Sequence, residues 1–201
     1  MTARDATMRE PILLGGDHPL RDQAEAFIRR LYAAEYGADI KKFPSRIIAS
    51  LDHFNQVDCA AGIRSKDDGF FSESYLNTPV EEALGRFAER KVSREQIFEV
   101  TTLASQAHRT TLHFIEAIGK FGEANGFNWS FFTLTRRLAL LVGRLGHPMI
   151  HLADADQCRI TDHHLWGTYY ASEPKVFAIQ SPRVAPGSRN PCERTMYAPS
   201  L

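Results

Sequence analysis

The amino-acid sequence predicts a mixed α/β fold, in which helices alternate with the strands of one sheet. The chain has 201 residues, of which 43% are hydrophobic and 24% are charged, as is typical of a globular protein with a sizeable core. Strand-like and helix-like patterns alternate along it, and no internal repeat interrupts them. We therefore expect a single domain over residues 1–180 and a C-terminal tail over residues 181–201, where four prolines occur.

The first strand and the first helix are predicted from turn and capping signals. A short apolar run at 11–14 ends at two glycines, which indicates a strand followed by a turn. Asp17 can cap a helix, Pro19 suits its first turn, and the apolar residues that follow recur at helical spacing up to about Tyr36.

A hairpin and a second helix are predicted next. Apolar residues alternate within 46–52, a polar turn around Asn55 follows, and 58–64 has a second strand-like pattern, which together indicate an antiparallel pair. The segment 78–81, Thr-Pro-Val-Glu, has the form of a capping box with Pro at the first helical position. It predicts a helix at 79–90.

The second half of the chain alternates more regularly. Gly126 ends one helical pattern, Gly146 and Pro148 end another, and Pro174 separates two short strand-like runs. The elements expected here are a strand at 96–104, a helix that starts within 105–111 and ends at about 124, a strand at 129–135, a helix at 136–145, and strands at 149–153, 166–170 and 175–180.

Charge and cysteine content argue against several functions. The 24 basic and 24 acidic residues balance, so no global field would attract nucleic acid or an anionic membrane. Cys59, Cys158 and Cys192 form no C-x-x-C pair, which argues against a zinc site and a disulfide framework and favours a reducing, cytoplasmic location. No stretch approaches the roughly 20 apolar residues that cross a bilayer, so no membrane insertion is expected.

A group of potential metal ligands lies late in the sequence. Two carboxylates follow a predicted buried strand, where such groups commonly cap the next turn, and the neighbouring histidines are expected on the surface. The residues concerned are His151, Asp154, Asp156, His163 and His164. We predict no metal site from them.

One acidic residue, Glu99, lies within an apolar run that is expected to form a buried strand. Alternate residues of a strand share a face, which groups Glu99 with Ile97 and Leu103. A carboxylate there must be hydrogen-bonded, paired or hydrated, and burial would raise its pKa toward that of a general base. An internal salt bridge to Arg64 or Arg94 is the alternative, and spacing alone does not choose between the two.

This strand runs into the start of a helix at 105–111. Helix starts have free amides and a positive dipole end, so they attract anions, and Arg109 could add a charge. No glycine lies between Ser105 and Ile118, so the segment lacks the flexible backbone of a typical phosphate-binding loop.

Several phrases in combination resemble one known family. They are AAGIR (60–64), FFSESYLNTPVEEAL (70–84), EVTTLAS (99–105), WSFFTLT (129–135), LADAD (152–156) and WGTYYASEPKVFAIQ (166–180). The combination is similar to the thermostable hemolysins, and thereby to the Gcn5-related N-acyltransferase (GNAT) superfamily, near the autoinducer synthases and N-acyl amino acid synthases. The resemblance spans about residues 10–180. It implies a GNAT-like mixed, mostly antiparallel sheet flanked by helices, with a splayed central strand pair at 96–104 and 129–135.

The resemblance also implies an activity and a site. The activity is transfer of an acyl or aminoacyl group from a phosphopantetheine thioester to an amine by direct attack, with no tightly bound cofactor and with Glu99 as the base. The residues implied for the donor are Leu103, Ala104, Ser105, Gln106, His108, Arg109, Thr110 and Thr133. Those implied for the acceptor pocket are Arg64, Trp166 and Tyr169, and Arg136 and Arg137 are plausible for docking of a carrier protein.

Two departures from the family pattern bear on the substrates. The segment 106–111 lacks the glycines with which acetyl-CoA users wrap a pyrophosphate, and a carrier protein presents only one phosphate. An acyl carrier protein is therefore expected as the partner in preference to acyl-CoA. Thr101 and Thr102 stand where autoinducer synthases have the Ser and Arg of an E-x-S-R phrase, which leaves the amine open. A membrane-active cytolysin and a non-catalytic binding module are the alternative functions.

Overall fold

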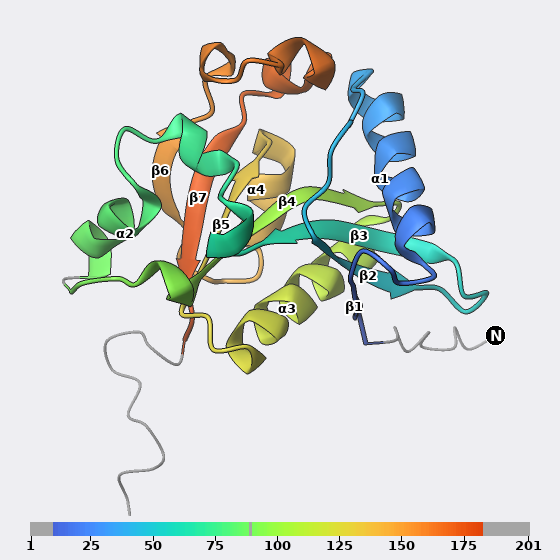
Figure 1. The fold of residues 1–201 in the computed structure, drawn as a ribbon, viewed down its shortest axis with the longest axis horizontal. Helices are drawn as coiled ribbons and strands as arrows, with labels where there is room; N and C mark the ends of the chain where they lie inside the picture. Colours follow the sequence, from blue (N-terminus) through green and yellow to red (C-terminus); the bar gives the residue numbers. More distant parts are fainter. Residues whose placement is uncertain (1–9, 89, 183–201) are drawn as a thin grey trace, which may run out of the picture.

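Seven strands form one sheet in this computed structural model, which describes residues 10–88 and 90–182, and four α-helices flank the sheet in that part of the chain (Figure 1). The strands are β1 (Ile12–Leu14), β2 (Arg46–Leu51), β3 (Val57–Arg64), β4 (Ile97–Ser105), β5 (Trp129–Leu134), β6 (Ile150–Asp154) and β7 (Lys175–Gln180). The helices are α1 (Arg21–Tyr36), α2 (Val80–Ala88), α3 (His108–Ala124) and α4 (Arg136–Gly143). The expected tail lies, from residue 183 on, outside the described residues.

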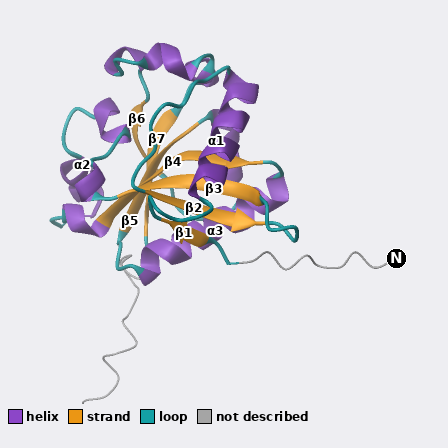
Figure 2. Ribbon diagram, turned by 45° about the vertical axis from the view of Figure 1, so that its right-hand side comes forward, coloured by secondary structure: helices purple, strands orange, loops and turns teal. Residues whose placement is uncertain are grey.

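The sheet is mixed and mostly antiparallel, as expected. Its strand order is β1-β2-β3-β4-β5-β7-β6, and β4 with β5 is the parallel pair, whereas the other pairs are antiparallel. The predicted hairpin is confirmed as β2 and β3. In Figure 2 the strands fan out across the sheet, and the parallel pair lies at its centre.

The central pair is splayed. The parallel ladder runs from Ile97↔Trp129 to Val100↔Phe132, but β4 continues to Ser105 and stays paired with β3 through Cys59↔Ser105. Two strands that part while one remains held by its other neighbour leave a gap between them, so this end of β4 presents backbone groups toward the gap.

A β-bulge in β4 changes the direction of its side chains. The register with β3 shifts between Ala60 and Gly62, and Thr102 has a φ of 47°, which a β-branched residue rarely adopts. Leu103 consequently packs in the cluster under α3, whereas Ala104 packs in the cluster under α1. The prediction that Leu103 shares a face with Glu99 is therefore wrong, because the bulge interrupts the two-residue alternation.

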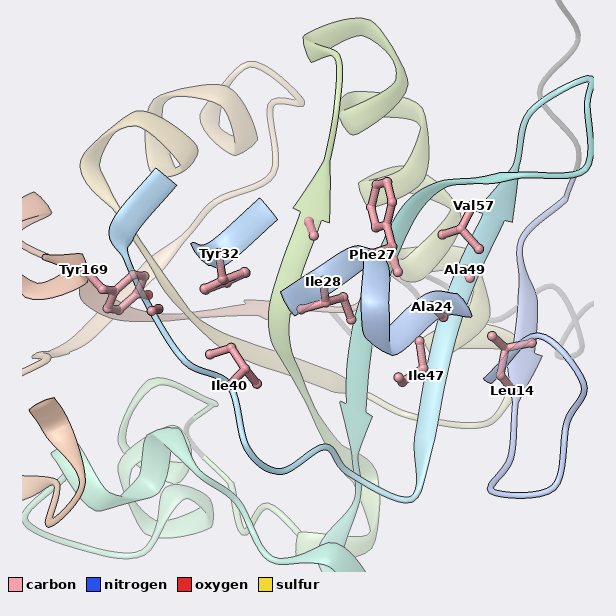
Figure 3. Packing of buried hydrophobic residues seen from close by; sticks show 13 residues of the cluster. Leu14, Ala24, Phe27, Ile28, Tyr32, Ile40, Ile47, Ala49, Val57 and Tyr169 are labelled. Carbon is pink, nitrogen blue, oxygen red and sulfur yellow. The ribbon is translucent and has the colours of Figure 1, made fainter. Parts of the chain in front are cut away.

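The helices cover both faces of the sheet. On one face, α1 packs on β1 to β4 through a cluster that includes Phe27, Ile28 and Ile47 (Figure 3), and α2 packs beside it over Ile97 and Phe131. On the other face, α3 covers β3 and β4, and α4 covers β5 and β7. Glu99 belongs to the first face, at the boundary between its two clusters.

The predicted strand at 166–170 is wrong. This segment forms two 3-10 turns, His163–Trp166 and Tyr169–Ser172, joined by Gly167 with a φ of 54°. The amide of Thr168 donates to the carbonyl of Tyr36 at 2.8 Å, so the segment lies on the end of α1 and its aromatic side chains pack there. The strand predicted at 175–180 is confirmed as β7.

Gly167→Ala should destabilise the fold strongly. A Cβ at this position would lie 2.0 Å from the carbonyl oxygen of Tyr36, and the positive φ adds strain. We expect a loss of about 3 kcal/mol in the free energy of unfolding, measured by urea denaturation. Gly126→Ala is the matched control, since its φ is 78° but its Cβ would meet nothing within 4 Å, and it should cost about 1 kcal/mol. Equal losses would show that the contact with α1 is not tight.

Candidate functional site

Glu99 is completely buried in the middle of the sheet. Its side chain is 0% exposed, and it lies opposite Arg64 in the register of β3 and β4. The amide of Phe71 donates to Oε2 and the amide of Ser72 donates to Oε1, both at 2.7 Å. The carboxylate is thus held by backbone groups rather than by solvent.

Burial dominates the electrostatics of this carboxyl group. Desolvation raises the pKa of Glu99 to about 7, and the hydrogen bonds from Ser72 and Phe71 and the charge of Arg64 oppose the rise. The salt bridges considered as alternatives do not form: Arg94 binds Glu73, and Arg64 Nη1 donates to the carbonyl of Asp68 at 3.2 Å. Among the described residues, Glu99 is therefore a hydrogen-bonded carboxyl group whose pKa is near neutral.

The two donor amides come from a segment that we call the strap, residues 70–76. Arg94 fixes it, because its guanidinium donates to both carboxylate oxygens of Glu73 at 2.6 Å and lies 4.5 Å above the ring of Phe70. Glu73 also accepts the amide of Val80 at the start of α2. The strap is thereby tied to α2 and to the chain just before β4.

The strap also contacts β5 and the segment after β6. The hydroxyl of Ser72 lies 2.7 Å from that of Thr133 in β5, and the hydroxyl of Tyr75 lies 2.7 Å from that of Tyr170. Burial raises the pKa of Tyr75, so its phenol stays neutral. These contacts close the strap over Glu99.

A cavity of about 930 Å³ begins at the gap between β4 and β5 and continues between α3 and α4. Its apolar walls include Val100, Ile115, Phe132, Leu138, Leu141 and Val142. Its polar end, near the gap, includes Tyr32, Tyr36, Ser105, Thr133 and Tyr169. A volume of this size, with apolar walls and a few polar groups at one end, is typical of a site for a small molecule or a cofactor arm.

The structure brings some of the predicted site residues together. Those that line the cavity are Leu103, Ala104, Ser105, Gln106, Thr133, Tyr169 and Arg137. Glu99 does not line it. Trp166 packs instead against Tyr32 and Phe71 in an aromatic cluster, and Arg64 binds the turn after β3.

The start of α3 lies at the polar end of the cavity. Ala107 occupies the N-cap position without a side-chain cap, so the first amides of the helix are not capped by that residue. The hydroxyl of Thr111 donates to Ser105 and to the carbonyl of Ala107, both at 2.8 Å. Arg109 is exposed, and the side chain of His108 lies outside the described part of the structure.

Sequence reasoning missed the strap. Phe71 and Ser72 lie 28 and 27 residues from Glu99 in sequence, and a backbone amide leaves no signature in side-chain patterns. Their phrase, FFSESY, contributes only to the family resemblance. Residue types indicate only cations as partners of Glu99, because charged side chains are recognisable in a sequence and the contacts of backbone amides are not.

The described residues contain neither a cluster of potential metal ligands nor a helix that could span a membrane. In 10–88 and 90–182, no group of three or more His, Cys, Asp or Glu side chains could hold a metal ion. His151 instead lies 3.3 Å from Asp154, which Lys175 also contacts at 3.2 Å. Within the same ranges no helix is both long and apolar enough to cross a bilayer.

Solved structures confirm the GNAT-like fold. The N-acyl amino acid synthase FeeM from uncultured soil microbes matches with a TM-score of 0.60 and 16% identity, over 90% of this chain and 94% of that one. The AHL synthase LasI matches with a TM-score of 0.55 and 13% identity, over 87% and 93%. TofI, in a ternary complex with an inhibitor and MTA, matches with a TM-score of 0.53 and 9% identity, over 86% and 91%.

The family comparison is more specific than these structural matches. No curated protein matches the sequence. The sequence model of the family described as "Thermostable hemolysin" matches residues 14–185, which covers nearly all of the α/β domain. The chain therefore belongs to the thermostable hemolysin family.

Proposed function

We propose that this chain is an N-acyltransferase that moves an acyl group from a phosphopantetheine thioester to a small amine. The observation that carries the proposal is the cavity at the splayed strands β4 and β5, together with the buried Glu99 of β4, whose pKa desolvation raises to about 7. The names of the matched synthases supply the acceptor class, since an N-acyl amino acid synthase acylates an amine. A binding module that holds the same ligands without chemistry is the alternative.

The donor would occupy the cavity along the free edge of β4. A pantetheine arm carries amide groups, which can pair with the backbone of residues 102–105 where β5 no longer does. Amides near Leu103 and Ala104 would polarise the thioester carbonyl. The acyl tail would lie against the apolar walls supplied by Ile115, Leu138 and Val142.

Glu99 would act as the base for direct attack. A general base works best when its pKa is near the operating pH, and burial brings Glu99 to that range. The amine attacks the thioester carbon, the carbon–sulfur bond breaks, and the thiolate leaves with the electron pair. A covalent acyl-enzyme is not required, because a thioester is already activated.

A carrier protein is the donor we favour. Ala107 gives α3 no side-chain cap and no glycine follows through Ile118, which suits the single phosphate of a phosphopantetheine better than a pyrophosphate. Arg136 and Arg137 are exposed in the first turn of α4, where positive charge opposes the helix dipole. They contribute little to the helix there, and they could attract an acidic partner.

The function can be tested by mixing the purified protein with decanoyl carrier protein or decanoyl-CoA and a panel of amino acids and alkyl amines. We expect N-decanoyl products by mass spectrometry, with faster formation from the carrier protein. Binding of either donor without product would support the binding module. Release of dye from lipid vesicles by the protein alone, without a donor, would favour the cytolysin that the family name suggests.

Glu99→Gln should reduce turnover at least ~100-fold at pH 7, because the carboxamide cannot take up a proton. It should also lower stability by about 1–3 kcal/mol, since one amide oxygen cannot accept both strap amides and the amide nitrogen faces a donor. Turnover measured on folded protein separates the two effects. Turnover equal to that of the wild type would exclude Glu99 as the base.

Stability should depend on pH through the same residue. The pKa of Glu99 is raised from 4.5 to about 7 on folding, so the folded state holds the proton more tightly. The resulting stabilisation, about 3 kcal/mol, is fully present below pH 4.5 and is lost as pH rises through 7. Urea denaturation from pH 5 to 8 should show this loss in the wild type and not in Glu99→Gln. Parallel curves would contradict the raised pKa.

Charge reversal at Arg136 and Arg137 should weaken binding of acyl carrier protein about tenfold or more, because the reversed side chains would repel an acidic partner. Isothermal titration calorimetry at low salt measures the change. Reversal at Arg86 and Arg90, which are also exposed but lie at the end of α2 and beyond it, is the matched control. If both pairs have the same effect, docking depends only on net charge.

A further inference from the structure

Glu99 and the cavity are separated in this structure. The carboxylate is 0% exposed and the strap covers it, yet the substrates that it would serve must occupy the cavity. A base must reach its proton directly or through intermediates that both donate and accept. Either the strap opens, or groups between the cavity and Glu99 carry the proton.

Two hydroxyl groups bridge this separation. Thr133 lines the cavity from β5, and its Oγ1 lies 2.7 Å from Oγ of Ser72 in the strap. The Ser72 side chain also acts on the carboxyl group of Glu99, whose pKa it lowers, and the Ser72 amide donates to Oε1 at 2.7 Å. Ser72 is 1% exposed, so this contact is shielded from solvent. The contacts therefore run from the cavity to Thr133, from Thr133 to Ser72, and from Ser72 to Glu99.

We propose that Thr133 and Ser72 form a proton relay that connects the amine in the cavity to the buried carboxylate of Glu99. Hydroxyls suit this role because each can accept one proton and donate another, and either oxygen of the pair can be the donor. The inference rests on the proposed function, in which Glu99 is the base. It assigns Thr133 to proton transfer rather than to donor binding.

The transfer balances without a further reactant. The ammonium nitrogen gives a proton to Oγ of Thr133, Thr133 gives its hydroxyl proton to Ser72, and Ser72 gives its own to Glu99. The neutral amine then forms the bond to the thioester carbon, and the electron pair of the broken carbon–sulfur bond leaves on sulfur. The second proton of the attacking nitrogen passes to the thiolate sulfur, and reversal of the relay then releases the first proton from Glu99 through the cavity to solvent. The products are an amide, a thiol and one proton.

Other groups near Glu99 do not replace this path. Arg64 faces it from β3, but a guanidinium has only donors and no site that accepts a proton. Tyr75 faces it from the strap, but its hydroxyl is bonded to Tyr170 and burial raises its pKa. Thr101 lies on the same face of β4, and its buried hydroxyl has no partner among the described residues. The Tyr75 phenol stays neutral because its pKa is raised, so the pH dependence expected of the relay comes from Glu99 and the amine.

Thr133→Val tests the relay, because it keeps the shape of the side chain and removes the hydroxyl. With the donor and amine that react best in the panel, we expect kcat/KM to fall about 100-fold at pH 7. The defect should shrink as the pH rises through the pKa of the amine used, because the amine then arrives already neutral and gives no first proton to the relay. Thr133→Ser should restore activity to within a few-fold. Thr101→Val is the matched control, since it removes a neighbouring hydroxyl outside the relay, and it should behave like the wild type.

The possible outcomes separate the relay from other roles. A loss in Thr133→Val that is equal at every pH, or that Thr133→Ser does not restore, would overturn the relay and indicate donor binding or packing. Undiminished activity in Thr133→Val would overturn it as well. If Thr133→Val does not fold, Ser72→Ala interrupts the same path and should show the same pH dependence. Failure of the wild type to form any product would instead overturn the proposed function, and the relay with it.

Discussion

The parting of β4 from β5 is the constraint on which the site depends. Because β4 remains bonded to β3 as far as Cys59↔Ser105, it does not follow β5 after Val100↔Phe132, and a gap opens between the two strands. The bulge at Thr102 then turns Leu103 toward α3 and into the cavity wall. A β-branched residue at positive φ costs roughly 1–2 kcal/mol, so the surrounding pairs must hold this geometry in place.

Glu99 shows how the same sheet tolerates a buried acid. Removal of the carboxyl group from water is unfavourable, and the two strap amides offset part of that cost without neutralising the charge. A full positive charge in direct contact would have pulled the pKa down, whereas dipoles leave burial as the larger effect. One of the two cations that the sequence suggested, Arg94, acts indirectly, because it fixes Glu73 and thereby the strap.

The sequence predicted most of the elements, because their signals are local. Turn residues, caps and periodicity located all seven strands and all four helices of the described part of the chain. The segment 166–170 was mistaken for a strand, since aromatic and β-branched residues there pack on α1 rather than in a sheet. The bulge at Thr102 and the strap amides also escaped prediction. The bulge at Thr102 contains no glycine that would indicate it in the sequence. The amide of Ser72 contacts a side chain that lies 27 residues away, so no local pattern indicates this contact.

The anchors of the strap bear on how substrates could approach. To open, the strap would have to break the paired hydrogen bonds of Glu73 with Arg94, the contact of Tyr75 with Tyr170, and the edge-to-face packing of Phe70 on Phe131. Charged bidentate pairs and buried aromatic contacts are among the stronger local interactions, so a closed strap is the favoured state. Substrates that enter the cavity from the other face of the sheet, between α3 and α4, would break none of these contacts. A cavity of about 930 Å³ lies near the upper end of the range for ligand sites, and it can hold the end of a pantetheine arm together with a small amine. Both substrates would then meet in the cavity at the splayed strands, and the buried carboxylate of Glu99 in β4 would act on them through Ser72 and Thr133.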